Sequence, residues 1–142
     1  MKKILFVCRG NVGRSQMAEA LTQKLFAHGE ITSAGTQLSG PEQTIESLQP
    51  KTDNVIAVMD EEGIDVRKKV RKQLTEEMLK VADFIIFTID EHDPIPSFVE
   101  KYPHEIWNIE DPKGKNLEET RKIKNQIKEK IQAFIQKLNA EH

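Results

Sequence analysis

Four short runs of apolar and branched residues punctuate the chain, at residues 4–7, 31–34, 84–89 and 105–109. Runs of this length are typical of strands, and a continuous apolar run is expected of a strand that is buried on both faces. The polar stretch 36–53, which contains a glycine and two prolines, predicts a long surface loop with room for one helical turn. The pattern therefore predicts four strands.

Between these strands, apolar residues recur at helical spacing. Residues 15–28 predict a helix with a glycine cap at Gly29, and residues 54–62 predict a helix that ends at Gly63. Thr75 is a candidate N-cap for a further helix, because two glutamates follow it and favour the first turn of a helix.

The last helix has the clearest boundaries. Asn116 is its candidate N-cap, and Glu119 occupies the capping-box position. Strands that alternate with helices predict an α/β fold, a three-layer α/β/α open sandwich around a parallel sheet. The apolar stripe of this last helix consists of Ile123, Ile127, Ile131, Phe134, Ile135 and Leu138.

Composition narrows the function classes. The 142 residues are the length of one domain, so a single domain over residues 1–142 is expected. With 21 Lys+Arg against 23 Asp+Glu, no nucleic-acid partner is expected. No apolar run approaches the roughly 18 residues of a membrane span, so no membrane partner is expected either. A single cysteine excludes an intrachain disulfide and favours a reducing, cytoplasmic location.

Ligands of open parallel sheets bind beyond the carboxyl ends of the strands. This rule selects residues 8–15, 35–40, 90–93 and 110–114 as the region of the candidate site. Cys8, the only thiol, ends the first strand just before a helix N-terminus, a position that favours an ionised sulfur.

The loop after Cys8 has the composition of an anion cradle. Gly10, Asn11 and Gly13 permit left-handed backbone conformations, in which successive N–H groups converge. Arg14 supplies a fork of donors that suits two oxygens of a phosphoryl group, and the Ser15 hydroxyl can stabilise the thiolate. This set predicts phosphoryl transfer through a phosphocysteine, without a metal.

Simpler interpretations stay open at this point. A lone cysteine after an apolar strand is usually an inert buried residue, and a phosphate loop can bind an oxyanion without turnover. Neither nucleotide-binding glycine motif is present in the loop. The histidines lack metal-ligand spacing, so no metal site and no cofactor are expected. They are His28, His92, His104 and His142.

The sequence of residues 8–15 resembles the phosphate loop of the low-molecular-weight protein tyrosine phosphatase family, which includes the thioredoxin-coupled arsenate reductases. The segments 33–36, 62–65, 74–86 and 111–112 resemble family segments in the same order. The resemblance implies a four-stranded parallel sheet in the order 2-1-3-4. It also implies that the phosphate-binding residues are Arg9, Gly10, Asn11, Val12, Gly13, Arg14 and Ser15, with Asn11 holding the loop together.

The leaving group of such a reaction needs a proton donor. From position alone, Asp90, Asp93, Glu110 and Asp111 are all candidates at the carboxyl ends of strands. The resemblance to the family assigns the role of general acid to Asp111, which precedes Pro112. The predicted catalytic residues are then Cys8, Arg14 and Asp111.

The chain departs from the family at three positions. Gly13 replaces a second loop cysteine, and Lys113 and Ser39 stand where aromatic residues would line the substrate pocket. These changes reduce the expectation of phosphotyrosine selectivity, while Lys113 and Arg9 favour an anionic substrate. The predicted partner is a phosphorylated protein, a small phosphomonoester or arsenate.

An arsenate reductase is the rival prediction. The residues after the third strand, 88–93, contain no thiol, so a disulfide relay within the chain is impossible. Arsenate reduction by this chain would require an external low-molecular-weight thiol that attacks an adduct of Cys8 with arsenate.

Overall fold

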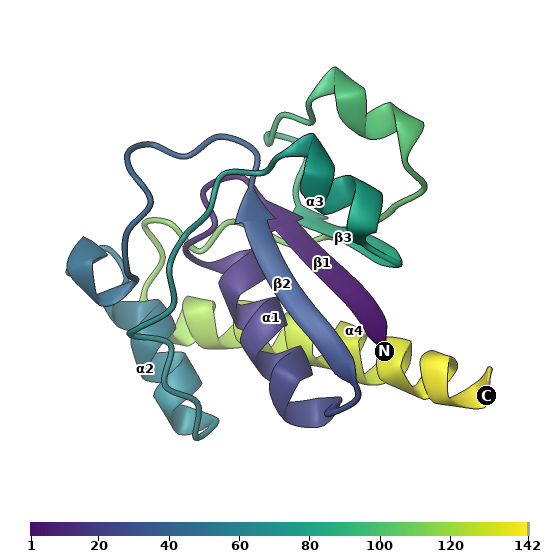
Figure 1. Ribbon diagram of the computed structural model, residues 1–142. Helices are drawn as coiled ribbons and strands as arrows, with labels where there is room; N and C mark the ends of the chain where they lie inside the picture. The colour runs from purple at the N-terminus through teal and green to yellow at the C-terminus, as the bar shows by residue number, and fades with distance from the viewer. Residues whose placement is uncertain (142) are drawn as a thin grey trace.

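A computed structural model describes residues 1–141 of the chain, so the expectation for His142 lies outside the described residues. Its centre is a parallel sheet of β1 (Lys2–Cys8), β2 (Gly29–Gly35), β3 (Phe84–Ile89) and β4 (Glu105–Asn108). The strand order is β2-β1-β3-β4 (Figure 1). The predicted fold class and strand order are therefore confirmed.

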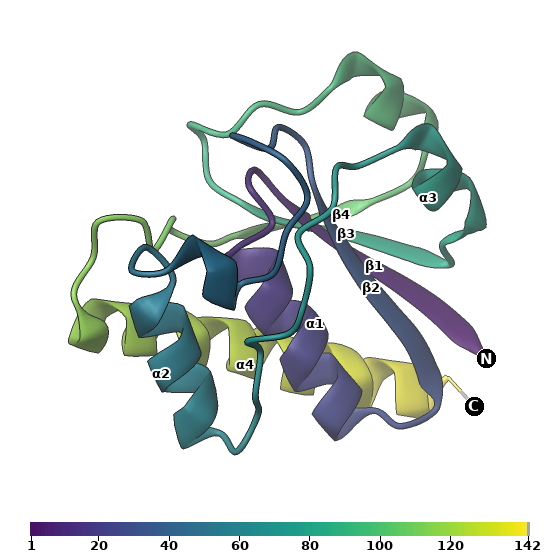
Figure 2. The same ribbon diagram turned by 60° about the vertical axis from the view of Figure 1, so that its left-hand side comes forward.

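Helices cover both faces of this sheet, as the two views in Figures 1 and 2 show. One face carries α1, α2 and α4, and the other carries α3 and the second of two 3₁₀ turns. None of the described helices combines the length and the apolar character needed to cross a membrane. The helical elements are α1 (Arg14–Leu25), α2 (Asp53–Glu61), α3 (Glu76–Val81), α4 (Leu117–Ala140), η1 (Glu46–Leu48) and η2 (Ser97–Lys101).

The central strand β1 is buried on both faces, as its continuous apolar run predicts. Successive side chains of a strand point to opposite faces, so Ile4 and Phe6 join the larger core with α1, α2 and α4. Leu5 and Val7 join the smaller core under α3. Both layers thereby hold the end of β1, where Cys8 lies, in a fixed position.

Most of the predicted boundaries agree with the structure. The Thr75 hydroxyl accepts a hydrogen bond from Met78 N (3.4 Å) at the start of α3, and Asn116 and Glu119 form the capping box of α4. The predicted cap at Gly29 is wrong, because α1 ends at Leu25 and Gly29 begins β2. A Cβ at Gly29 would lie 2.7 Å from Ile31 Cδ1 and 2.9 Å from Phe26 Cδ2, so these two side chains leave little room for a larger residue at this position.

The loops that follow the four strands meet at one edge of the sheet. Thr36 N donates to the carbonyl of Cys8 (2.9 Å), and Ile109 N donates to the carbonyl of Ile89 (2.9 Å). These bonds link the loop after β1 to that after β2, and the end of β3 to that of β4. The topology thus gathers the four predicted site segments at one edge.

Candidate active site

The Cys8 sulfur lies at the carboxyl end of β1 and faces the loop 8–15. Its Sγ lies 2.9 Å from Ser15 Oγ, and Asn11 N donates to it at 3.3 Å. Cys8 is only 2% exposed. The sulfur therefore has polar partners inside the loop, which an inert core cysteine lacks.

Asn11 connects this loop to its surroundings through both ends of its side-chain amide. Its Nδ2 donates to Ser15 Oγ (2.8 Å) and Ser33 Oγ (3.0 Å). Its Oδ1 accepts from Lys72 N (2.8 Å) and Gln16 Nε2 (3.2 Å). Asn11 is fully buried, so these four bonds satisfy an amide that would otherwise be costly to bury.

The network continues beyond Asn11 into α1. Ser33 Oγ donates to Glu19 Oε1 (2.8 Å), and the other oxygen of Glu19 forms an ion pair with Lys69. Lys69 Nζ also donates to Gln23 Oε1 (3.0 Å). The conformation of the loop 8–15 is thus tied to β2, to α1 and to the segment 69–72.

Backbone strain in this loop falls on the asparagine and not on the glycines. Asn11 has φ 55°, whereas the glycines with positive φ in residues 1–141 are Gly63 and Gly114. The expectation of left-handed glycines in the loop is therefore wrong. Gly13 has a different reason to lack a side chain, because a Cβ there would lie 2.9 Å from Pro112 Cγ.

Arg14 is buried and held by an end-on ion pair with Asp93. Its Nη1 donates to Asp93 Oδ2 (2.7 Å) and to the carbonyl of Ile109 (3.0 Å), and Nη2 donates to Asp93 Oδ1 (3.2 Å). Burial tends to lower the pKa of Arg14, but the bond to Asp93 and the nearby acidic groups, Cys8 included, raise that pKa above its usual value. Arg14 is therefore a permanent positive charge at the site.

Asp93 itself has a pKa below its usual value. Burial alone would raise this pKa, and the bonds from Arg14 and from the backbone N–H of Asp90 (2.9 Å) outweigh that effect. The carboxylate is consequently ionised at neutral pH.

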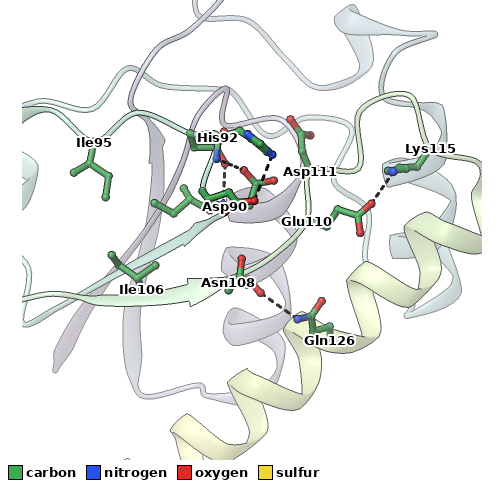
Figure 3. Close-up of a pocket in the computed structure, with 12 residues that line it drawn as sticks. Asp90, His92, Ile95, Ile106, Asn108, Glu110, Asp111, Lys115 and Gln126 are labelled. Carbon is green, nitrogen blue, oxygen red and sulfur yellow. Dashed lines mark hydrogen bonds and ion pairs between the residues drawn. The ribbon is translucent and has the colours of Figure 1, made fainter.

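Asp111 stands beside Arg14 with one oxygen available. Its Oδ2 lies 3.8 Å from Arg14 Nη2, while Oδ1 accepts a hydrogen bond from Lys113 N (2.9 Å). The side chain is 45% exposed. Its neighbour Glu110 turns away and pairs with Lys115 at 2.7 Å (Figure 3). Of these two adjacent carboxylates, Asp111 is the one that lies near the loop 8–15.

A cleft of about 990 Å³ adjoins the site on the side of β4. Figure 3 shows Asp111 at its rim and Ile95 and Ile106 along the wall. Asp93 also lines it, so the Arg14–Asp93 ion pair forms part of the boundary between this cleft and the loop 8–15. The carboxylate of Asp111 therefore borders open space on this side.

The segment 36–44 also adjoins the loop 8–15, since Gln37 N donates to the carbonyl of Arg9 (2.9 Å), and forms part of the opening of this loop to solvent, its mouth. Buried Arg71 holds this segment by donating to the carbonyl of Pro41 (2.8 Å) and contacting Ser39 Oγ (3.4 Å). Ser39, Lys113 and Arg9 are all exposed. The positions that would carry aromatic walls are therefore polar and open to solvent.

The structure brings the three predicted catalytic residues to one edge of the sheet, and places the other predicted loop residues around Cys8. Sequence reasoning did not anticipate the ion pair of Asp93 with Arg14, although Asp93 was among the candidate acids. The support of Asn11 by Lys72 N was also missed, because a backbone group in an irregular segment has no sequence signature. Among the described residues, no three His, Cys, Asp or Glu side chains gather as a potential metal site.

Comparisons with known proteins place the chain in a family. A family model described as low molecular weight phosphotyrosine protein phosphatase matches residues 3–142. The glutaredoxin arsenate reductase of Synechocystis sp. is 32% identical over 152 residues, which cover 98% of this chain and 100% of that protein.

Two solved structures show the same likeness. An arsenate reductase in the phosphate binding state has a TM-score of 0.78 and 32% identity, covering 96% of this chain and 98% of that one. The low molecular weight protein tyrosine phosphatase from T. tengcongensis has a TM-score of 0.73 and 29% identity, covering 96% and 99%. Fold and sequence together define a phosphatase-like α/β enzyme. The chain belongs to the low molecular weight phosphotyrosine protein phosphatase family.

Proposed function

We propose that this protein hydrolyses phosphomonoesters through a phosphocysteine intermediate on Cys8. The observation that carries the proposal is the convergence of two polar groups on one sulfur: the backbone N–H of Asn11 donates to it at 3.3 Å, and the Ser15 hydroxyl, which can donate to a thiolate, lies at 2.9 Å. Donors aimed at a sulfur favour the thiolate, which is the nucleophilic form.

In the first step, Arg14 and the backbone amides of residues 9–15 hold the phosphoryl oxygens. The Cys8 thiolate attacks phosphorus, so that a sulfur–phosphorus bond forms while the bond to the leaving oxygen breaks. The leaving oxygen keeps the electron pair and takes a proton from Asp111. Positive charge and oriented amides stabilise the negative charge of the transition state.

In the second step, water attacks the phosphocysteine. Asp111, now a carboxylate, accepts a proton from this water, and the sulfur–phosphorus bond breaks to release phosphate. The electron pair returns to Cys8, which is again a thiolate. The exposed side of Asp111 gives water a path to this position.

The substrate class is a phosphorylated protein or a small phosphomonoester. The mouth lacks aromatic walls at Ser39 and Lys113, so selectivity for phosphotyrosine over other phosphomonoesters is not part of the proposal. Because Cys8 must stay reduced to act, a reducing, cytoplasmic location fits this chemistry.

The test is turnover of p-nitrophenyl phosphate by the wild-type protein and by Cys8→Ser. We expect hydrolysis by the wild-type protein, loss of turnover in Cys8→Ser and a phosphorylated protein on rapid acid quench of the wild type. Phosphate binding without turnover in the wild-type protein would instead identify a non-catalytic oxyanion-binding module.

Arsenate reduction with an external thiol is the second candidate, favoured by relatives that are named arsenate reductases. With one cysteine in the chain, the relay has to involve a thiol from outside. That thiol would attack the Cys8 sulfur of a Cys8–arsenate adduct, forming a mixed disulfide. The sulfur–arsenic electron pair would pass to arsenic, releasing arsenite, and a second thiol would restore Cys8.

The burial of Cys8 favours hydrolysis over this alternative. Attack on phosphorus needs only a substrate inside the loop, whereas reduction requires an external thiol to reach a sulfur that is 2% exposed. Arsenite formation with added glutathione, measured beside phosphate release from p-nitrophenyl phosphate, decides between them. Arsenite production without phosphatase turnover would overturn the hydrolase proposal.

A further inference from the structure

The ion pair with Asp93 uses hydrogens on both Nη atoms of the Arg14 guanidinium. Arginine carries five N–H groups, two on each Nη and one on Nε. Both Nη1 hydrogens are used, one by Asp93 Oδ2 and one by the carbonyl of Ile109. One Nη2 hydrogen is used by Asp93 Oδ1. Within residues 1–141, the Nε hydrogen and the second Nη2 hydrogen have no hydrogen-bond acceptor.

These two remaining donors lie on the same edge of the planar guanidinium. Nε and Nη2 present parallel N–H bonds, the arrangement that binds two oxygens of a phosphoryl or arsenate group. Asp111 Oδ2 lies 3.8 Å from Nη2, beyond hydrogen-bonding distance, so it does not use either of these two hydrogens. The contacts of Arg14 therefore select which edge faces an incoming oxyanion.

Asp93 is held rigidly enough to impose this orientation. Its side chain is 4% exposed, and its Oδ2 also accepts the backbone N–H of Asp90 at 2.9 Å. It is thereby fixed to the carboxyl end of β3, on a different segment from Arg14. A buried guanidinium without a charge partner is unfavourable, so Asp93 also keeps Arg14 in the site while no oxyanion is bound.

We propose that Asp93 is a positioning residue that presents the Nε–Nη2 edge of Arg14 to the oxyanion before it arrives. This inference rests on the proposed role of Arg14 in binding the phosphoryl group. Asp93 itself does not touch the substrate. It removes the need to reorient Arg14 during binding, which is the general benefit of a preorganised site.

The test measures binding of inorganic phosphate by calorimetry in Asp93→Ala, Asp93→Ser and Asp93→Asn. Asp93→Ser keeps an acceptor for the Asp90 backbone but cannot reach both Nη groups of Arg14. We expect Asp93→Ala and Asp93→Ser each to weaken phosphate binding about 10-fold to 100-fold. Asp93→Asn retains one acceptor but loses the charge and the acceptor for the second Nη group, so its loss should be intermediate, smaller than that of Asp93→Ser. Glu91→Gln, an exposed change in the same loop, is the matched control.

A double-mutant cycle with Arg14→Lys separates positioning from general damage to the fold. Lysine has no fork to orient, so Asp93→Ser should weaken phosphate binding no further in the Arg14→Lys protein. An equal loss in both backgrounds would overturn the proposal, and so would unchanged or tighter binding in Asp93→Ser. If Asp93→Ala does not fold, the Ser and Asn variants carry the same comparison.

Binding of phosphate does not depend on turnover, so this result is separate from the hydrolase proposal. A protein that binds phosphate as expected in all variants but releases none from p-nitrophenyl phosphate supports the role of Asp93 and rejects hydrolysis. If the wild-type protein hydrolyses the substrate but Asp93→Ser binds phosphate with unchanged affinity, the hydrolase proposal is supported and the role of Asp93 is rejected.

Discussion

The side-chain amide of Asn11 donates a hydrogen bond to the hydroxyl of Ser15, at 2.8 Å. The direction of this bond is fixed, because Asn11 Oδ1 already accepts the backbone N–H of Lys72, a group that can only donate. The oxygen of Ser15 is therefore an acceptor from Asn11, which leaves its single hydrogen available for Cys8 Sγ, 2.9 Å away. A thiolate can only accept, so Ser15 is the donor whenever Cys8 is ionised. A chain of donors runs from the backbone of residue 72 to the sulfur.

Ser15→Ala removes the last donor of this chain. A hydrogen bond to a charged group contributes about 1.5–3 kcal/mol, so the variant loses one of the contacts that stabilise the nucleophilic thiolate. Alkylation of Cys8 by iodoacetamide at pH 6 should be about tenfold slower in Ser15→Ala. Ser39→Ala, which alters an exposed hydroxyl at the mouth, should react at the wild-type rate. Equal rates in all three proteins would show that Ser15 does not donate to the sulfur.

Substitutions of Asn11 separate its hydrogen bonds from its backbone conformation. Asn11→Ala loses the buried bonds of the amide and places an alanine at φ 55°. We expect a loss in the free energy of unfolding of about 2–4 kcal/mol. Asn11→Gly loses the same bonds without the strain and should be about 1 kcal/mol more stable than Asn11→Ala. Urea unfolding of the two variants provides the comparison, and equal stabilities would contradict a strained backbone.

Asp111→Asn tests the proton donor. The amide cannot protonate a leaving oxygen, so kcat for alkyl phosphates should fall by about 10²–10⁴. The fall should be smaller for p-nitrophenyl phosphate, whose leaving group needs little protonation. Affinity for inorganic phosphate should be unchanged, because Asp111 does not hold the phosphoryl group in the proposed mechanism.

Glu110→Gln is the control for this experiment. Glu110 precedes Asp111 but pairs with Lys115 at 2.7 Å, and its side chain points in a different direction from that of Asp111 (Figure 3). Its substitution should leave kcat near the wild-type value. A large loss in Glu110→Gln with little loss in Asp111→Asn would transfer the proton-donor role to Glu110.

Periodicity and capping signals predicted most of the fold. The strand at residues 84–89 and the capping box at Asn116 are local features, encoded by residues close together in the chain, and the structure has both. The role of Gly29 was predicted wrongly, because a glycine after a helical pattern can serve either as a helix cap or as a small residue in a tightly packed place. The clash of a Cβ with Ile31 is a packing effect that the local sequence does not reveal.

The site was predictable to the extent that it is contiguous. Residues 8–15 carry their chemistry in one segment, whereas the partner of Arg14 is 79 residues away, at Asp93. The strand topology limits that partner to the loops at the same edge of the sheet, which contain several acids. Choosing among them requires the direction of each side chain, and this depends on the packing of β3 and β4.

Glu62 provides a pH-dependent contribution to stability away from the site. Its hydrogen bonds with Lys124 (2.7 Å) and Lys128 (2.8 Å) lower the pKa of Glu62 and tie the end of α2 to α4. A carboxyl whose pKa is lower in the folded protein stabilises the fold above its unfolded pKa of about 4.3. That contribution is lost as the pH falls through the pKa of the folded state.

Glu62→Gln should therefore reduce the free energy of unfolding at pH 7 by about 1–3 kcal/mol. The gap to the wild-type protein should shrink as the pH falls below about 4, because the wild-type carboxyl is then protonated too. Urea unfolding at pH 7, 5 and 3 measures the gap directly. Glu129→Gln, an exposed change on α4, should leave stability close to that of the wild type at each pH. A gap for Glu62→Gln that is as large at pH 3 as at pH 7 would contradict the ionic origin of this contribution, because no charged carboxylate then remains to pair with the two lysines.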